Sequence, residues 1–445
     1  MIDRRPAAET ALVVHPQGWD TDPERAEARL EEAAGLAEAL DLVPVEARVE
    51  PVRKLDPGAY FGSGKVEQLK ERCAELGVSV LIVDTALTPV QQRNLEKALN
   101  VKVVDRTGLI LEIFGRRAQT REGRLQVELA RLTYERSRLV RTWTHLERQR
   151  GGQGFMGGPG ETQIETDRRI LADKMAKLRR ELDEVKRTRE LHRKRRKAAP
   201  WPTVALVGYT NAGKSSVFNR LSEAKVLAKD MPFATLDPTT RAVRTPSGRK
   251  ILLSDTVGFI TDLPTELIAA FRATLEEVVE ADVLVHVRDM ADPDNEGRKR
   301  DVEGVLDALD AGEAHGQTII EAWNKADRLD PETREDLHWR TRLPRKPGRP
   351  VSVLTSAETG EGLDQLMAFV DRALAAEDVV LTVKAGASDA AALAWIHEHG
   401  VMLDDRIDRE TGATWAVARL TRPDAGRFRR KFPGLEVAEE RAVAE

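Results

Sequence analysis

The amino-acid sequence predicts an α/β protein built from several domains. Its 445 residues exceed what one hydrophobic core normally organises. In two separate parts of the chain, short runs rich in Val and Ile alternate with stretches of helical periodicity, which is typical of parallel sheets flanked by helices. A long basic segment with helical periodicity separates these parts. We therefore expect four units, which span residues 1–118, 119–199, 200–376 and 377–445.

The first unit is predicted to be a small parallel α/β subdomain. Apolar runs at residues 10–16 and 79–87 are typical of strands, and "VKVVDRTGLILEIF" at residues 101–114 continues the same pattern. Residues 22–40 and 65–77 carry apolar side chains at helical spacing. Strands that alternate with helices in this way favour a parallel sheet.

A turn in this unit, "FGSGKVEQL" at residues 61–69, imitates a phosphate-binding loop. Its Gly64-Lys65 pair is followed by Val66, and Ala59 stands where such a loop needs its first glycine. We interpret it as a strand-to-helix turn, with nucleotide contact as the lesser alternative.

The second unit is predicted to be a long helical hairpin. Residues 121–150 are expected to form one helix, and Leu125, Leu129 and Leu132 are spaced for one face of it. A second helix is expected from residue 161 onward. Its apolar stripe is formed by Ile164, Ile170 or Leu171, Met175, Leu178, Leu182 and Val185. Residues 151–160, "GGQGFMGGPG", contain six glycines and are predicted to form the tip.

Charge is concentrated in this second unit. Residues 119–199 contain 22 Lys and Arg against 12 Asp and Glu, whereas the whole chain has a net charge of −4. Such segregation indicates a segment that faces a polyanion, and a solvated helical face is the equal alternative.

The remaining composition excludes several classes of protein. The single cysteine, Cys73, rules out an intramolecular disulfide and fits a reducing compartment. The sequence shows no signal-like apolar stretch at its start, and no apolar run near the roughly 18 residues that a membrane span requires. We expect a cytoplasmic monomer without stable membrane insertion.

The third unit contains a phosphate-binding loop. In "TVALVGYTNAGKSSVFNRL" at residues 203–221, a buried strand leads into Gly208, a second glycine, Gly213, precedes Lys214-Ser215, and a helix follows. Glycines let backbone N–H groups turn toward phosphate oxygens, and the helix N-terminus adds its positive dipole. Lys214 is expected to reach the β- and γ-phosphates, and the Ser215 hydroxyl to ligate Mg²⁺.

Further motifs indicate that the nucleotide is GTP or GDP. "ILLSDTVGF" ends a strand at Asp255, which can hold the Mg²⁺ shell, and the Gly258 N–H can meet the γ-phosphate. "NKAD" ends another strand, and the Asp327 carboxylate can accept hydrogen bonds from guanine N1–H and its 2-amino group. Adenine would leave that carboxylate unpaired. "SAE" at residues 356–358 follows a further strand, where a backbone N–H can meet guanine O6.

The fourth unit reads as a small α+β module. From residue 378 onward the pattern predicts a strand, a helix, two strands and a final helix. The fold class is therefore α/β and multidomain: a parallel α/β subdomain with a helical hairpin, a Ras-like P-loop G domain and a C-terminal α+β domain.

The chain resembles the HflX family of translation-associated GTPases over essentially its whole length. The specific markers are "GGPGETQIETDRR" at residues 157–169 and "GYTNAGKS" at residues 208–215, together with "FATLDPTTR" and "DTVGF". In the glycine stretch, Met156 stands where family members usually carry a basic residue. The resemblance implies a GTPase that binds the large (50S) ribosomal subunit and, in some members, splits stalled ribosomes under stress. It also implies that the glycine-rich tip is presented to ribosomal RNA.

The resemblance further implies which residues form the site. Thr235 is expected to complete the Mg²⁺ shell with Ser215, and Thr239 and Thr240 are its competitors. The residues expected to act in hydrolysis are Lys214, Thr235, Asp255 and Gly258. The residues expected to bind the nucleotide are Gly208, Tyr209, Thr210, Asn211, Ala212, Gly213, Lys214, Ser215, Phe233, Ala234, Thr235, Leu236, Asp237, Asp255, Thr256, Val257, Gly258, Asn324, Lys325, Ala326, Asp327, Ser356, Ala357 and Glu358.

Two positions depart from the simplest Ras-like scheme. Phe259 occupies the place where Ras-like enzymes carry a water-orienting glutamine, and a phenyl ring cannot orient water by hydrogen bonding. We therefore expect slow intrinsic hydrolysis that the ribosome stimulates. Asn211 occupies the place where some relatives hold K⁺ beside the phosphates, and a structural asparagine in a tight turn is the equal alternative.

The leading interpretation is a Mg²⁺-dependent GTPase that the 50S subunit activates. One alternative is an RNA-binding or remodelling protein with an additional ATPase activity in its N-terminal unit. Another is a membrane- or protease-associated regulator in which the G domain is a scaffold, but no amphipathic, lipid-binding segment supports it.

Overall fold

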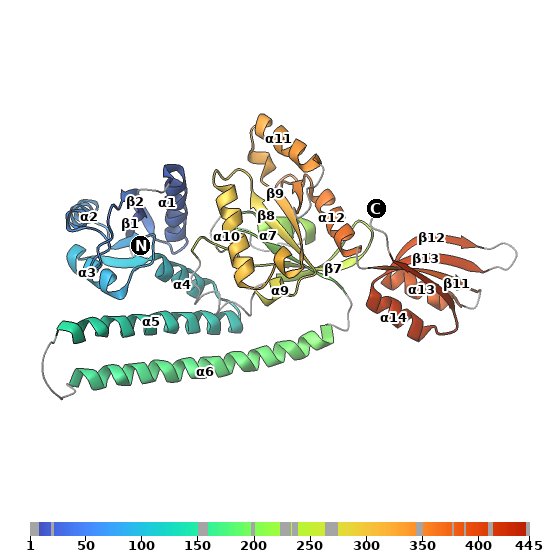
Figure 1. The fold of residues 1–445 in the computed structure, drawn as a ribbon, viewed down its shortest axis with the longest axis horizontal. Helices are drawn as coiled ribbons and strands as arrows, with labels where there is room; N and C mark the ends of the chain where they lie inside the picture. The colour runs from blue at the N-terminus through green and yellow to red at the C-terminus, as the bar shows by residue number, and fades with distance from the viewer. Residues whose placement is uncertain are drawn as a thin grey trace, which may run out of the picture.

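The structure is a computed structural model, and it describes residues 9–18, 22–149, 159–196, 201–222, 233, 239–262, 275–343, 350–375, 378–386, 389–407 and 413–441. Within these residues the chain forms three β-sheets, each with its own helices, and the three follow one another along the long axis of the molecule (Figure 1). Two long helices run beneath the first two sheets in this view (Figure 1). The predicted multidomain α/β fold class is confirmed.

The N-terminal sheet is parallel and has the strand order β2-β1-β3-β4. Because successive residues of β1 point to opposite faces, Ala11 and Val13 pack with α1 and α4, whereas Leu12 and Val14 pack with α2 and α3. The elements are β1 (Thr10–Gln17), α1 (Pro23–Glu38), β2 (Val43–Pro51), α2 (Ser63–Leu76), β3 (Val80–Val83), α3 (Pro89–Leu99), β4 (Lys102–Asp105) and α4 (Arg106–Arg117).

One predicted strand of this sheet is corrected by the structure. The run at residues 101–114 is a strand only as far as Asp105, and α4 begins at the next residue. The Asp105 carboxylate accepts a hydrogen bond from the Gly108 backbone N–H at 2.9 Å, so it caps the new helix. An apolar run that looks uniform in sequence is therefore divided by one capping side chain.

The hairpin consists of α5 (Arg121–Gln149) and α6 (Pro159–Arg196), which lie side by side (Figure 1). In α6, Met175 and Leu182 are buried as predicted, but Ile170 is 45% exposed. The buried face of α5 is formed mainly by Val127, Ala130 and Leu132. The predicted glycine-rich tip lies outside the described residues except for its last two.

The central sheet has the order β10-β9-β8-β5-β7-β6, in which only the edge strand β6 is antiparallel to its neighbour. Its strands are β5 (Thr203–Val207), β6 (Thr239–Arg244), β7 (Lys250–Asp255), β8 (Val283–Asp289), β9 (Thr318–Asn324) and β10 (Val351–Leu354). Its helices are α7 (Lys214–Ser222), α9 (Glu276–Val279), α10 (Asn295–Ala308), α11 (Pro331–Arg342) and α12 (Leu363–Ala375).

The two faces of the central sheet have different neighbours. Val204 and Leu206 of β5 pack with α7 and α12, whereas Ala205 and Val207 belong to the cluster that contains α10. This second cluster continues without interruption into α1 and α4 of the N-terminal subdomain. One hydrophobic core therefore joins the first and third units of the chain.

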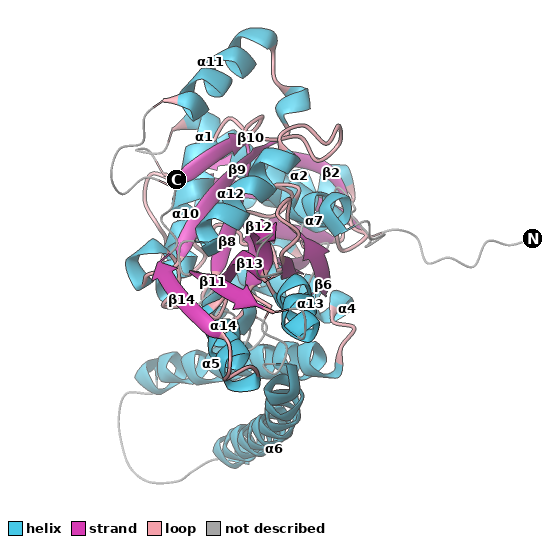
Figure 2. Ribbon diagram, turned by 90° about the vertical axis from the view of Figure 1, so that its right-hand side faces the viewer, coloured by secondary structure: helices cyan, strands magenta, loops and turns pink. Residues whose placement is uncertain are grey.

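The C-terminal sheet is antiparallel and has the order β12-β13-β11-β14, with α13 and α14 packed on one face (Figure 2). Its elements are β11 (Val379–Ala385), α13 (Ala390–His399), β12 (Val401–Ile407), β13 (Thr414–Leu420), α14 (Arg422–Lys431) and β14 (Glu436–Arg441). The last strand was not predicted. Arg249, just before β7, forms ion pairs with Asp371 of α12 and with Asp378, which directly precedes β11, and the second pair ties this domain to the central one.

Candidate functional site

The candidate site lies at the carboxyl edge of the central sheet. The loop after β5 begins at Gly208, which has φ of 149°, and an added Cβ there would lie 2.2 Å from the Val287 carbonyl oxygen. Gly213 has φ of 93°, and its added Cβ would lie 2.3 Å from the Asn324 amide nitrogen. Both positions therefore require glycine, and the loop backbone approaches its neighbours closely.

Lys214 begins α7 and is buried beneath this loop. Its ammonium group donates to the carbonyl oxygens of Gly208 at 3.1 Å and Tyr209 at 2.7 Å. Burial lowers the pKa of Lys214 to about 8, and the nearby Asp255 carboxylate opposes that shift. The cation is thus fixed inside the loop that the sequence assigns to phosphate.

Ser215 and Asp255 come together, although they are 40 residues apart. The Ser215 hydroxyl donates to Asp255 Oδ2 at 2.6 Å at the end of β7. Hydroxyl and carboxylate oxygens are hard donors of the kind that Mg²⁺ prefers, so this pair fits the implied metal.

The segment after β7 is joined to the phosphate-loop candidate by backbone hydrogen bonds. The Phe259 N–H donates to the Gly208 carbonyl at 3.1 Å, and the Thr210 N–H donates to the Phe259 carbonyl at 2.7 Å. Between them, an added Cβ on Gly258 would lie 3.0 Å from the Lys214 ammonium nitrogen and 2.9 Å from Thr210 Cα. Gly258 therefore lies directly beside the lysine, and only glycine fits there.

The predicted switch residues are only partly visible. Residues 234–238, which include Thr235, lie outside the described residues. Phe233 is buried, and its ring packs edge-on against Phe114 of α4 with 4.5 Å between ring centroids. The Thr240 hydroxyl lies 3.4 Å from the Ser254 hydroxyl. Because successive residues of β7 point to opposite faces of the sheet, Thr240 faces away from Asp255, the residue after Ser254. Thr239 is paired in register with Asp255.

The predicted guanine-binding motifs are connected to each other and to the loop. The Asn324 side-chain amide donates to the Ala212 carbonyl at 2.9 Å, and its oxygen accepts from the Ala357 N–H at 3.1 Å. The Asp327 carboxylate accepts from the Ser356 hydroxyl at 2.5 Å. The four motifs thus form one continuous edge, as the sequence predicts for a nucleotide site.

A cavity of about 260 Å³ lies beside the loop, between α1 of the N-terminal subdomain and α10. Asn211, which has φ of 61°, and His286 are among the residues that line it. Burial lowers the pKa of His286 to about 3, so this ring is neutral at physiological pH. The left-handed conformation of Asn211 fits a tight turn, and its role toward K⁺ stays a hypothesis.

Four family profiles match successive parts of the chain. Residues 27–115 match "GTP-binding GTPase N-terminal" and residues 117–196 match "GTP-binding GTPase Middle Region". Residues 203–325 match "50S ribosome-binding GTPase", and residues 344–442 match "HflX C-terminal domain".

Curated relatives match over most of their length. The GTPase HflX of Magnetococcus marinus is 50% identical over 390 residues, which cover 87% of this chain and 88% of that protein. The GTPase HflX of Escherichia coli is 44% identical over 381 residues, 85% of each chain. The chain belongs to the HflX family of GTPases.

As a member of the HflX family, the chain is a P-loop GTPase that binds guanine nucleotides. A solved structure of a GTP-binding protein from Sulfolobus solfataricus in complex with GDP is similar, with a TM-score of 0.43 and 24% identity, covering 82% of this chain and 98% of that chain. No helix among the described residues is long and apolar enough to cross a membrane.

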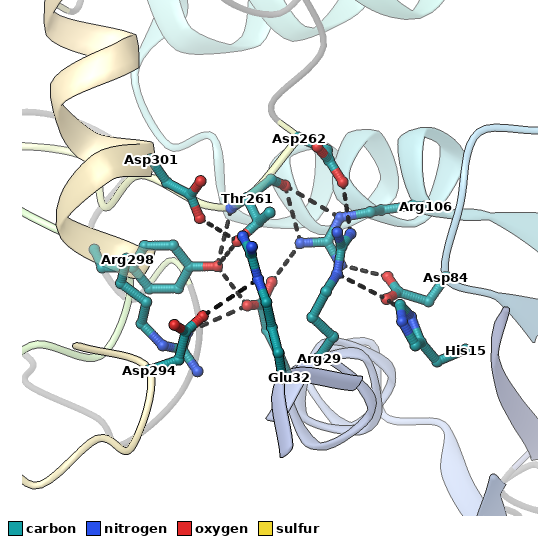
Figure 3. A network of polar contacts seen from close by, with 12 residues as sticks. His15, Arg29, Glu32, Asp84, Arg106, Thr261, Asp262, Asp294, Arg298 and Asp301 are labelled. Carbon is teal, nitrogen blue, oxygen red and sulfur yellow. Dashed lines mark hydrogen bonds and ion pairs between the residues drawn. The ribbon is translucent and has the colours of Figure 1, made fainter. Parts of the chain in front are cut away.

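Sequence reasoning missed the residues of the N-terminal subdomain that reach this HflX-family site. Glu32 of α1 contacts Tyr209, and Arg106 of α4 contacts Thr261 beside the candidate site (Figure 3). Glu32 and Tyr209 are 177 positions apart, and no motif links them. Only the fold brings them together.

Proposed function

We propose that this GTPase binds the large (50S) ribosomal subunit, is activated by it, and splits or rescues ribosomes under stress. The observation that carries the proposal is that one chain combines a long hairpin in its basic segment, α5–α6, with a candidate guanine-nucleotide site built from four motifs. The family description "50S ribosome-binding GTPase" for residues 203–325 supports it. Domain limits near residues 118, 199 and 376 are part of the proposal, as are a monomeric state and a cytoplasmic location.

The proposed roles follow the geometry of the site. Lys214 neutralises the β- and γ-phosphates, and the Gly258 N–H donates to the γ-phosphate. Asn324 stabilises the phosphate loop through its hydrogen bond to the Ala212 carbonyl, and Asp327 selects guanine. Ser215 and a switch threonine, Thr235 or Thr239, would hold Mg²⁺, with Asp255 supporting that shell; when bound, Mg²⁺ neutralises charge on the phosphate oxygens.

Slow intrinsic hydrolysis is part of this proposal. Phe259 is 1% exposed and belongs to the core shared with α4, so its ring serves packing and cannot orient water. A partner must therefore supply or order the missing group, and the ribosome is the partner we propose. Basic side chains on the hairpin would contact RNA phosphates.

The alternative with an N-terminal ATPase has less support. Residues 61–69 contain the start of α2, and the Lys65 ammonium of this helix lies 2.6 Å from a carboxylate oxygen of the buried Glu50. A lysine held in this way is occupied by the subdomain's own carboxylate. ATPase activity of a fragment ending at residue 199 would revive the alternative.

The test is co-sedimentation of the full chain with 50S subunits in the presence of a non-hydrolysable GTP analogue or GDP, together with GTP turnover with and without subunits. We expect more binding with the analogue and a stimulation of turnover of at least tenfold. Equal binding in both states and no stimulation would contradict the proposed function while leaving GTP binding intact.

A further inference from the structure

A polar network crosses from the N-terminal subdomain to the candidate site (Figure 3). Arg106, at the first position of α4, donates from Nε and Nη2 to the Thr261 carbonyl oxygen at 3.2 and 3.0 Å. Arg29 of α1 pairs with the next residue, Asp262, at 2.6 Å. Residues 261 and 262, which closely follow Gly258, are thus held by two guanidinium groups from another domain.

The same network holds the phosphate loop. The Tyr209 hydroxyl donates to the Glu32 carboxylate and accepts from the Thr261 backbone N–H at 2.9 Å. Glu32 is in turn paired with Arg106 and with Arg298 of α10. Tyr209 therefore stands between the loop after β5 and the segment after β7, and one carboxylate of α1 fixes its hydroxyl.

The centre of the network is buried, so its contacts are costly to break. Arg106 and Asp84 are each 2% exposed, and Tyr209 is 4% exposed. Removing one partner of a buried ion pair leaves the other charge uncompensated, which is strongly destabilising. Groups held in this way keep one geometry.

The N-terminal subdomain also contacts the segment that precedes the switch threonines. Arg117 of α4 donates to the Phe233 carbonyl at 2.8 Å, and Phe114 packs against the Phe233 ring. Helix α4 therefore contacts the segments on both sides of the expected γ-phosphate position, Phe233 before it and Thr261 after it.

We propose that Glu32 and Arg106 are positioning residues for GTP hydrolysis. By holding Tyr209 and Thr261, they keep Gly258 beside Lys214, where its N–H can receive a γ-phosphate. The inference rests on the proposed nucleotide site and adds residues from outside the G domain to it. GDP has no γ-phosphate, so its binding does not use the Gly258 N–H that this restraint keeps in place.

The test uses Glu32→Gln in the full chain, because it keeps the side-chain shape and removes the charge that Tyr209, Arg106 and Arg298 share. We expect the Kd for a non-hydrolysable GTP analogue to rise at least fivefold and kcat to fall at least fivefold. The Kd for GDP should stay within twofold of the parent. The matched control is Glu67→Gln, which removes an exposed ion pair on α2 with Lys70 and should change neither value.

Three outcomes would overturn the inference. The first two are an unchanged Kd for the GTP analogue and a lower Kd for it. The third is an equal loss of affinity for the GTP analogue and for GDP, accompanied by a drop in Tm. A parent protein that binds neither nucleotide would instead refute the proposed site.

A second variant guards against simple misfolding. Combining Glu32→Gln with Tyr209→Phe should change the ratio of the two Kd values by less than the two single effects added together, because both variants remove the same hydroxyl–carboxylate contact. Full additivity would show that Glu32 acts by another route and would also overturn the inference.

Discussion

At the scale of single residues, Asp327 is the side chain on which base selectivity depends. Its carboxylate accepts a hydrogen bond from the Ser356 hydroxyl, so its position is fixed before any base arrives. Ser356 follows β10, the strand next to β9, which ends at Asn324. We predict that Asp327→Asn weakens GTP binding by at least a hundredfold and shifts preference toward xanthosine nucleotides, because their 2-oxo group needs a donor. Competition binding with GTP, XTP and ATP measures this.

A nearby aspartate provides the control for that experiment. Asp330 caps α11, accepting from the N–H groups of Glu332 and Thr333, and among the described residues it contacts none of the nucleotide motifs. Asp330→Asn should leave the GTP affinity within twofold. Unaltered GTP affinity in Asp327→Asn would show that the guanine site lies elsewhere.

Asp84 gives the interdomain network a pH dependence. Burial alone would raise the pKa of its carboxyl, but Arg106, His15 and Arg29 hold that pKa at about 2. Because the ordinary value is 3.8, the charged carboxylate contributes stability that is complete above about pH 4 and is lost as the pH falls through 2. The shift corresponds to about 2 kcal/mol.

We therefore predict that Asp84→Asn unfolds more easily than the parent at neutral pH and that the difference shrinks as the pH falls from 4 toward 2. Urea unfolding of both proteins at pH 7, 4 and 3 measures the two free energies. A difference that stays constant over this range would show that the Asp84 charge does not stabilise the fold.

At the scale of elements, Asp105 joins two segments of the N-terminal subdomain to α5 of the hairpin. Its carboxylate caps α4 through Gly108, accepts from the Leu87 N–H at 3.1 Å, and binds Tyr134 and Arg138 of α5. We predict that Asp105→Ala lowers the free energy of unfolding by about 3 kcal/mol, because it removes a cap and a buried charged acceptor together. Hydrogen exchange should also rise in the first half of α5.

An exposed aspartate serves as the matched comparison. Asp336 pairs with Arg340 on the surface of α11, with 50% of its side chain exposed, so Asp336→Ala should cost less than about 0.5 kcal/mol. If the two variants lose the same stability, Asp105 does not organise α4 and α5 as we infer.

The elements that were predicted from the sequence and those that were missed differ in how regularly their apolar residues are spaced. The strand of residues 10–16 and the helices of residues 22–40 and 65–77 have clear periodicity and are confirmed. The missed β14, "EVAEER", is an edge strand with three glutamates, and only its register with β11 makes it a strand. α4 was missed because no turn residue separates it from β4.

At the scale of the whole molecule, the site motifs were predictable, whereas the contacts between domains were not. Strand ends carry Asp255 and Asn324, so their convergence follows from parallel sheet topology. The pairing of Glu32 with Tyr209 depends on how two domains pack, and a single sequence contains no pattern that reports it. Those contacts became visible only in the folded chain.

The hairpin tip at residues 151–160 should act on the ribosome and not on the nucleotide site. None of these residues belongs to the nucleotide motifs, and the central sheet has a core of its own on the face that α7 and α12 cover. We predict that a short Gly-Ser linker in their place leaves free GTP binding and basal hydrolysis nearly unchanged. Stimulation by 50S subunits should fall at least fivefold, because we expect the tip to enter a narrow RNA cleft that the linker cannot reach.

Affinity for the subunit should fall less than stimulation does. The basic side chains of α5 and α6 remain, and contacts to phosphate supply the salt-dependent part of binding. GTP turnover with and without 50S subunits, compared with co-sedimentation at two salt concentrations, separates the two effects. If stimulation survives the replacement intact, the tip only connects the helices, and activation must pass through the sides of the hairpin or through another domain.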